Sequence, residues 1–354
     1  MHIVKANNLN RLWNEIRDEV QRTSDLSLSN GICQGGEITK LAEVRLEVVT
    51  NSKLHNAVIF HSCTDALTQG LRNLNLPAGS EVLVPAYTFI ATATSILLAG
   101  LKPVFVDVGN DYCIDLSDAK EKITNNTRVM LYVTLWGNSM NKYAKTFCDE
   151  NNLLLVEDAA QSLGAPLNDA EFTVLSFSPS KPCTTMGSGG ALITKNKDVF
   201  ELARLGRLHG KSNNSTPSIG LGVNSMISST EAATLYITLG LMKKHQSKRQ
   251  KIANIYKQEL RDLYEFPDYT QDCTYSKFVI KCDKRDELAQ HLRSNNIQTQ
   301  IHYSILPIQE KIFDVNYSNF KNSLTLQEKS LTIPNCPYMT DDEIERVLEC
   351  LKKF

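Results

Sequence analysis

The sequence has no long hydrophobic run and no excess of charge of either sign. None of its apolar stretches reaches 18 uninterrupted residues, so we expect no transmembrane helix, and the first residues lack the apolar core of a signal peptide. The 38 Lys and Arg residues and 39 Asp and Glu residues leave a formal net charge of −1. Proteins that bind nucleic acid or an anionic membrane need a basic field, so we expect neither partner.

Cysteine and histidine are present, but not in the spacings of a disulfide framework or a metal site. Nine cysteines are scattered from Cys33 to Cys350 without a Cys-x-x-Cys pair, and the seven histidines form no His-x-x-x-His pattern. An odd, dispersed set of cysteines is typical of reduced thiols, so we expect a cytoplasmic protein without a metal centre. No Gly-x-Gly-x-x-Gly follows a predicted strand, which argues against a dinucleotide-binding dehydrogenase.

Short apolar runs alternate with helical stretches between about residues 57 and 195. The runs predict buried strands over 81–86, 102–108, 128–135, 153–159, 172–178 and 190–194. Helices are predicted between several of them, over 64–74, 90–100 and 141–151. Near-continuous apolar strands that alternate with helices indicate an α/β fold, with a mostly parallel central sheet flanked by helices.

The pattern changes in the last third of the chain. Longer helices are predicted over 197–208 and 229–264, with a Ser-, Asn- and Gly-rich loop over 210–222 that we expect to be mobile. After residue 265 the pattern predicts a strand over 275–282, a helix over 285–295 and a last helix from 340. We therefore expect a large α/β domain with an N-terminal arm over 1–240 and a smaller C-terminal α+β domain over 241–354.

Polar residues that follow two of the predicted strands indicate a binding site. In open α/β sheets, ligands lie at the carboxyl ends of the strands. Asp158 ends the strand "LLLVED", where a buried carboxylate is costly unless a cation meets it. Ser176 and Lys181 lie in "VLSFSPSKPCTTMGSGG" (174–190), in which a single lysine follows a strand on a loop of Ser, Thr, Pro and Gly.

Two further segments add an anion cradle and an aromatic plate. "SCTDAL" (62–67) places Cys63 and Thr64 at the start of a helix, where unpaired N–H groups favour an anion. Phe89 follows another strand in "PAYTF", although Tyr87 could serve as the plate instead. Pyridoxal 5′-phosphate (PLP) needs all these groups: donors for its phosphate, a carboxylate for its ring nitrogen, a flat neighbour and a Schiff-base lysine.

The order of these motifs resembles the DegT/DnrJ-type sugar aminotransferase family, a group of fold-type-I PLP enzymes, along nearly the whole chain. The resemblance rests on "HSCTDAL", "VPAYTFIATATSILLAGLKPVFVDV", "VEDAAQSLGA", "SFSPSK", "GVNSMISSTEAA" and "IPNCPYMTDDEIERVLECLKKF". It implies that Asp158 contacts the pyridine nitrogen, Gln161 lies near the ring oxygen and Ser176 reaches the phosphate. It further implies that Lys181 holds the cofactor. Asn224 would reach the phosphate of the neighbouring subunit in a homodimer.

The resemblance also implies a function. The protein would transfer an amino group, with glutamate as the expected donor, to the ketone of a nucleotide-linked keto-deoxy sugar, in synthesis of an amino sugar for a polysaccharide or glycosylated metabolite. Ser188, Met226 and Pro307 depart from the usual pattern on the substrate side. The alternatives are a PLP-dependent sugar dehydratase, whose relatives carry histidine in place of the lysine, and a PLP-binding regulatory protein without turnover.

Overall fold

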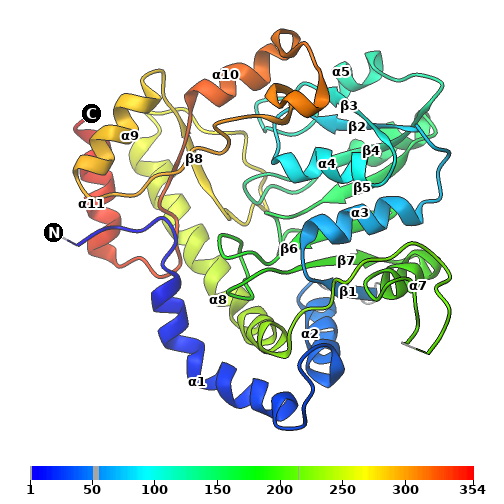
Figure 1. Cartoon of the computed structure of the whole chain (residues 1–354). Helices are drawn as coiled ribbons and strands as arrows, with labels where there is room; N and C mark the ends of the chain where they lie inside the picture. Colours follow the sequence, from blue (N-terminus) through cyan, green and yellow to red (C-terminus); the bar gives the residue numbers. More distant parts are fainter. Residues whose placement is uncertain (1, 51–55, 214) are drawn as a thin grey trace.

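The centre of the molecule is a seven-stranded sheet. A computed structural model describes residues 2–50, 56–213 and 215–354 (Figure 1). The strands run in the order β1-β7-β6-β5-β4-β2-β3, and β7 alone runs in the opposite direction to the other strands. Their bounds are β1 Asn56–Phe60, β2 Glu81–Pro85, β3 Lys102–Val106, β4 Thr127–Val133, β5 Leu154–Asp158, β6 Phe172–Ser176 and β7 Gly190–Thr194.

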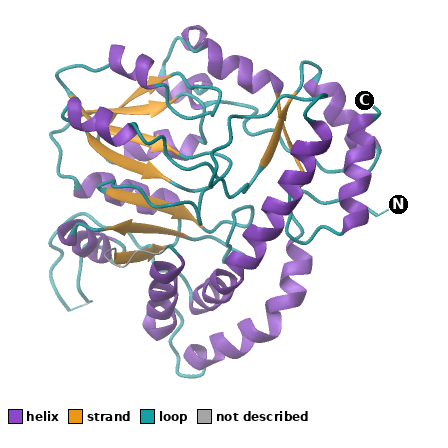
Figure 2. Cartoon of the chain, turned by 180° about the vertical axis from the view of Figure 1, so that it is seen from behind, coloured by secondary structure: helices purple, strands orange, loops and turns teal. Residues whose placement is uncertain are grey.

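Helices cover both faces of the sheet, as Figure 2 shows from behind. Because successive side chains point to opposite faces, Val156 packs into one core and Leu155 into another. The first face carries α3 Cys63–Asn73, α4 Ile90–Leu98 and α7 Lys197–Gly206. The second carries α2 Gly36–Val49, α5 Leu116–Glu121, α6 Ala144–Glu150 and α8 Ser229–Leu260. The strands are therefore buried on both sides, which explains their near-continuous apolar sequences.

A smaller α+β unit follows. Its two strands, β8 and β9, are antiparallel and form a separate sheet with its own buried core. The long helix α8 runs without a break across residue 240, and its second half packs into that core. The division of the chain at residue 240 stays a prediction. The elements are β8 Phe278–Lys281, α9 Arg285–Ser294, the short 3-10 helices η1 Pro307–Gln309, η2 Lys311–Phe313 and η3 Tyr317–Asn319, α10 Lys321–Lys329, β9 Ser330–Ile333 and α11 Asp341–Lys352.

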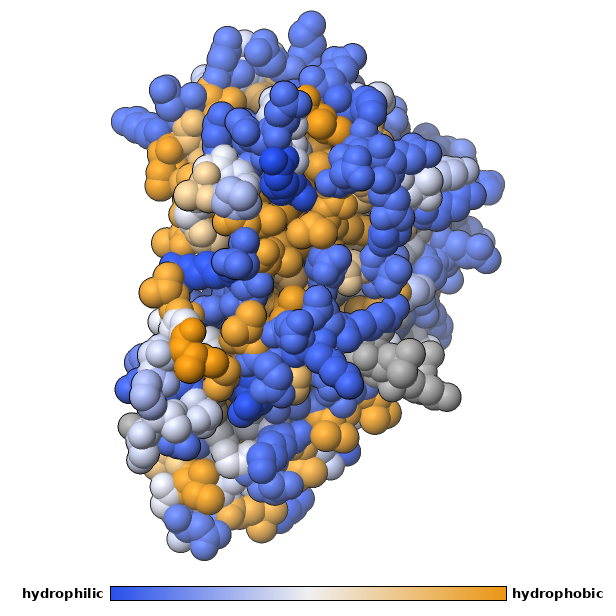
Figure 3. All heavy atoms as spheres, turned by 90° about the vertical axis from the view of Figure 1, so that its right-hand side faces the viewer, coloured by the Kyte–Doolittle hydropathy of each residue, from blue (hydrophilic) through white to orange (hydrophobic). Residues whose placement is uncertain are grey.

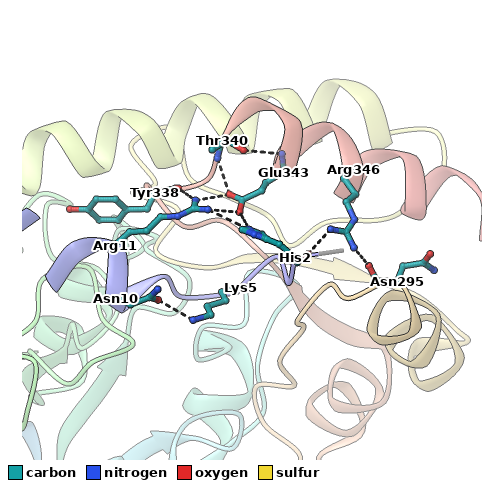
Figure 4. Close-up of polar contacts among 9 residues, drawn as sticks. All are labelled: His2, Lys5, Asn10, Arg11, Asn295, Tyr338, Thr340, Glu343 and Arg346. Carbon is teal, nitrogen blue, oxygen red and sulfur yellow. Dashed lines mark hydrogen bonds and ion pairs between the residues drawn. The ribbon is translucent and has the colours of Figure 1, made fainter. Parts of the chain in front are cut away.

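The N-terminal arm is joined to the smaller unit (Figure 4). Arg11, in α1 Leu9–Leu28, donates hydrogen bonds of 2.8 Å to both carboxylate oxygens of Glu343 in α11. Burial alone would raise the pKa of Glu343, but the hydrogen bonds from Arg11 and the Thr340 amide, together with the charges of Arg11 and His2, lower that pKa. Arg346 adds a hydrogen bond of 2.7 Å to the carbonyl of His2. The first residues of the chain thus pack beside the last helix.

The expected α/β architecture with a mostly parallel sheet is confirmed. Each predicted strand begins within two residues of the observed start, except that β8 begins three residues later than expected. The sequence pattern missed β1, α1, α2, α5, α10 and β9. Residue 214, in the predicted loop 210–222, lies outside the described residues, and the rest of that loop contains no helix or strand. Across the described ranges, no helix is long and apolar enough to span a membrane.

Candidate active site

One cavity of about 410 Å³ opens at the carboxyl ends of the strands. This is where an open α/β sheet places its ligands, because the loops that follow the parallel strands meet there. The cavity brings together seven of the eight site residues that the sequence predicts, and they come from four separate segments. These seven are Cys63, Thr64, Phe89, Asp158, Gln161, Ser176 and Lys181.

Asp158 presents a buried carboxylate to this cavity. It is the last residue of β5, pairs with Val133 of β4 and Val174 of β6, and is only 5% exposed. Its Oδ2 accepts a hydrogen bond of 2.8 Å from Thr92, and its Oδ1 accepts one of 3.1 Å from the amide of Ala160. Burial raises the pKa of Asp158, while these bonds and nearby Lys181 act in the opposite direction. A cation in the cavity would therefore be bound strongly by this group.

Lys181 supplies an amine to the same cavity. Its loop begins after β6, and its backbone N–H donates to the carbonyl of Ser178 at 3.0 Å, which turns the chain back toward the sheet. Burial lowers the pKa of the Lys181 amine, whereas Asp158 and Cys63 oppose that shift. A lowered pKa increases the neutral fraction of the amine. The neutral amine is the form that attacks a carbonyl carbon or accepts a proton.

The start of α3 forms an anion cradle beside these groups. Ser62 caps the helix by accepting a hydrogen bond of 3.0 Å from Asp65, so the amides of Cys63 and Thr64 stay without an intrahelical partner. Ser176 ends β6 and adds a hydroxyl at the cavity wall. Gly190 allows the close approach, because a Cβ there would lie 2.2 Å from the amide nitrogen of Cys63. The helix dipole and the donors suit a phosphate.

The aromatic side of the cavity is formed by Phe89 and Tyr303. Phe89 caps α4, is 54% exposed and lies 5.8 Å from Tyr303 between ring centroids. Tyr87, the alternative aromatic plate, is fully buried against Tyr112 and does not line the cavity. Gln161 accepts a hydrogen bond of 3.0 Å from the amide of Trp136 and donates one of 2.9 Å to the Tyr303 hydroxyl. Its amide is thereby held in one orientation.

Asn224 does not line the cavity of its own chain. It forms an isolated antiparallel bridge with Leu208, and the next residue, Ser225, accepts a hydrogen bond of 2.8 Å from the His61 amide. The segment therefore lies against the chain that leads into α3. Of the departures from the family pattern, Ser188 lines the cavity, whereas Met226 and Pro307 do not.

Thr92 and Lys277 are among the residues of the cavity wall that the sequence did not predict. Thr92 bonds Asp158 from α4, and its place in an unbroken run of helix-forming residues gave no signal of that contact. Lys277 lies directly before β8 and was expected only as part of a strand in the smaller domain. His302 and Tyr303, from the smaller unit, also line the cavity. The smaller unit thus closes over the end of the large sheet.

The donor set of this cavity fits PLP. The start of α3 with Ser176 offers donors for a phosphate, and the buried Asp158 carboxylate suits a protonated pyridine nitrogen. Phe89 is a flat neighbour on the cavity wall, and Lys181 offers an amine for an aldehyde. Among the described residues no group of three or more His, Cys, Asp or Glu side chains is arranged to hold a metal ion.

Comparison with known proteins gives a consistent result. The sequence profile of the DegT/DnrJ/EryC1/StrS aminotransferase family matches residues 14–352. A relative from Aneurinibacillus thermoaerophilus, named dTDP-3-amino-3,6-dideoxy-alpha-D-galactopyranose transaminase, is 32% identical over 306 residues, which cover 82% of this chain and 83% of that protein. A Bacillus subtilis relative, named 3-oxo-glucose-6-phosphate:glutamate aminotransferase, is 30% identical over 329 residues, 87% of this chain and 74% of its own.

The fold agrees with these sequence matches. The crystal structure of S. venezuelae DesV is 26% identical and superposes with a TM-score of 0.95, covering 100% of this chain and 98% of that chain. The profile match and the superposition both include the sheet, the cavity and the smaller unit. The chain therefore belongs to the DegT/DnrJ/EryC1/StrS aminotransferase family, as its motifs predict.

Proposed function

We propose that the protein is a PLP-dependent aminotransferase that moves an amino group from glutamate to the ketone of a nucleotide-linked keto-deoxy sugar. The observation that carries this proposal is the shared cavity of Asp158 and Lys181, in which a buried carboxylate and a half-buried lysine lie beside the start of α3. Relatives named as transaminases of dTDP- and UDP-linked amino sugars support the substrate class. A cytoplasmic location and a role in amino-sugar biosynthesis follow from the same proposal.

Each group has a distinct task in this reaction. When bound, PLP supplies an electron sink for the carbon that carries the transferred nitrogen. Asp158 holds the proton on the ring nitrogen, and Thr92 with the Ala160 amide keeps the carboxylate oriented. Lys181 holds the cofactor between turnovers and moves the proton at the substrate carbon. The amides of Cys63 and Thr64 bind the phosphate, which keeps that carbon close to the Lys181 amine.

The alternatives fit the cavity less well. In the sugar dehydratases that resemble this family the lysine is replaced by histidine, whereas this chain keeps Lys181 in the cavity. A PLP-binding regulatory protein without turnover would not need an amine with a lowered pKa beside the carboxylate, and burial does lower the pKa of Lys181. The amine at this position favours the aminotransferase.

The surface of the chain supports a homodimer. The large apolar side chains of Leu98 and Leu221 are exposed near α3. The carbonyl of Leu98 accepts a hydrogen bond of 2.7 Å from Arg72 of α3, and that of Leu221 accepts one of 3.1 Å from Gln69 of α3. Figure 3 shows apolar residues gathered across the middle of one side of the molecule. An exposed apolar patch of this kind marks an interface. A second copy on this side would bring another chain close to the segment that contains Asn224.

The substrate assignment is tested with a panel of nucleotide-linked keto sugars. The PLP-loaded protein is incubated with each sugar and glutamate, and 2-oxoglutarate is measured. We expect glutamate-dependent 2-oxoglutarate with at least one sugar, together with a sugar product whose mass shows an amine in place of the ketone oxygen. The Lys181→Ala variant is the control and should release none. A loaded wild-type protein that aminates no sugar of the panel would contradict the proposed function.

Replacing the cavity carboxylate should slow turnover. Asp158→Asn removes the charge that keeps the ring nitrogen protonated, so kcat should fall at least about tenfold, equivalent to about 1.4 kcal/mol of barrier. Asp158→Glu should keep part of the activity. The matched control is Glu157→Gln, because Glu157 is also buried but points to the opposite face of β5 and bonds Asn168 and Thr173. Equal rates for Asp158→Asn and Glu157→Gln would refute the assignment.

The shared site is tested by mixing two inactive variants. Asn224→Asp should repel a phosphate, and Lys181→Ala lacks the amine, so each should be nearly inactive alone. If Asn224 serves the partner's cavity, subunit exchange restores about a quarter of all sites in a symmetric dimer. Asp158→Asn mixed with Lys181→Ala is the control, because both residues line the same cavity and no intact site can form. No recovery with Asn224→Asp after confirmed exchange would exclude a shared site.

A further inference from the structure

Lys277 is a second lysine in the cavity wall, and it is buried without a carboxylate partner. Its residue is only 7% exposed, and its Nζ donates a single hydrogen bond, of 3.1 Å, to the backbone carbonyl of Ser180. Across the described ranges no Asp or Glu forms an ion pair with it. Burying an ammonium group is unfavourable unless an anion pairs with it. The site therefore lacks a negative charge to balance Lys277.

The surroundings of Lys277 are positive. Arg249 of α8 is also buried, and the described part of the chain gives its guanidinium no ion pair. Burial, followed by the charges of Lys181 and Arg249, lowers the pKa of Lys277 to about 7. His302 stays neutral, because burial and the same lysines lower its pKa to about 3. An anion that entered this part of the cavity would meet several positive groups and no competing carboxylate from the smaller unit.

A second lysine on the same segment shows the usual arrangement. Lys281 ends β8, four residues after Lys277, and its Nζ lies 3.0 Å from Oε2 of Glu265. The chain therefore pairs one lysine of this segment with a carboxylate of its own. Lys277 has none, and it faces the cavity in which the reaction is proposed to take place.

The position of Lys277 indicates which anion it meets. Ser180, the residue that it bonds, directly precedes Lys181 in the chain. The Lys277 amine is thus held beside the backbone of Lys181, and near enough to the Lys181 amine for that charge to lower the pKa of Lys277. In an amino acid, the α-carboxylate is bonded to the carbon that carries the reacting amine. The nucleotide of the acceptor lies several bonds farther from its reacting ketone carbon.

We propose that Lys277 forms the subsite for the α-carboxylate of the amino donor. This rests on the proposed aminotransferase function and names the residue that recognises the donor. An ammonium group has three N–H donors, and the Ser180 carbonyl uses one of them, so two remain for the carboxylate. The ion pair that forms supplies the missing negative charge and places the donor nitrogen on the Lys181 side of the cavity. A carboxylate on a sugar acceptor would offer Lys277 the same kind of ion pair, so it is the alternative ligand.

The test measures binding of glutarate and needs no turnover. Glutarate has the carboxylates of glutamate without its amine, and calorimetry on the PLP-loaded protein gives its Kd. Lys277→Met should raise the Kd for glutarate at least about tenfold. Lys277→Arg should raise it less, because arginine keeps the positive charge. The matched control, Lys281→Met, should change the Kd less than twofold. In steady state, KM for glutamate should rise for Lys277→Met and the KM of the sugar should not.

A second arm separates the two sources of a carboxylate. UDP-glucuronate, which carries an acid group on its sugar, is titrated into the same variants. If Lys277→Met weakens UDP-glucuronate but leaves glutarate unchanged, the residue recognises the acceptor and the donor assignment is overturned. Unchanged binding of both also overturns it. If Lys277→Met does not fold, Lys277→Gln replaces it. Glutarate binding does not depend on the sugar. If the wild-type protein is inactive with every keto sugar, the proposed function is contradicted, and the glutarate measurement still tests the role of Lys277.

Discussion

The burial of charged groups at one edge of the sheet is the constraint on which the rest of this structure depends. Asp158, Lys181 and Lys277 line the same cavity, where each would be unfavourable alone. Asp158 accepts hydrogen bonds from Thr92 and the Ala160 amide, which compensate part of the cost of its burial. The two amines lack a comparable set of partners in the described structure. Such a site is stable chiefly when the charges of its ligands complete it.

The fold provides the means to hold these groups together. Parallel strands β4, β5 and β6 deliver their carboxyl ends to one edge, so that Asp158 and Ser176 become neighbours although 17 residues of chain lie between them. Gly190 lets the start of α3 approach that edge closely. The smaller unit then adds Lys277, His302 and Tyr303 from the opposite side. The groups that we propose for reactant recognition and those that we propose for cofactor binding therefore come from different parts of the chain.

Much of the large domain could be predicted from the sequence, because its strands are buried on both faces and read as continuous apolar runs. The site residues that end strands or begin a helix, such as Asp158 and Cys63, were predictable for the same reason. The pattern gave no prediction for β1, although that strand has five residues like β2, β3, β5, β6 and β7. Thr92 and Lys277 could not be predicted, since each reaches the cavity through packing between segments far apart in the sequence. The role of Asn224 depends on a second chain and stays a prediction.

The most direct measurement is to identify the lysine that carries the cofactor. The PLP-loaded protein is reduced with borohydride, digested and mapped by mass spectrometry. Two amines line the cavity, so the outcome distinguishes between them. Our account predicts the cofactor on Lys181, with no covalent label in Lys181→Ala and an unchanged label in Lys277→Met. A label on Lys277, or on any lysine outside the cavity, would contradict the assignment of the active site.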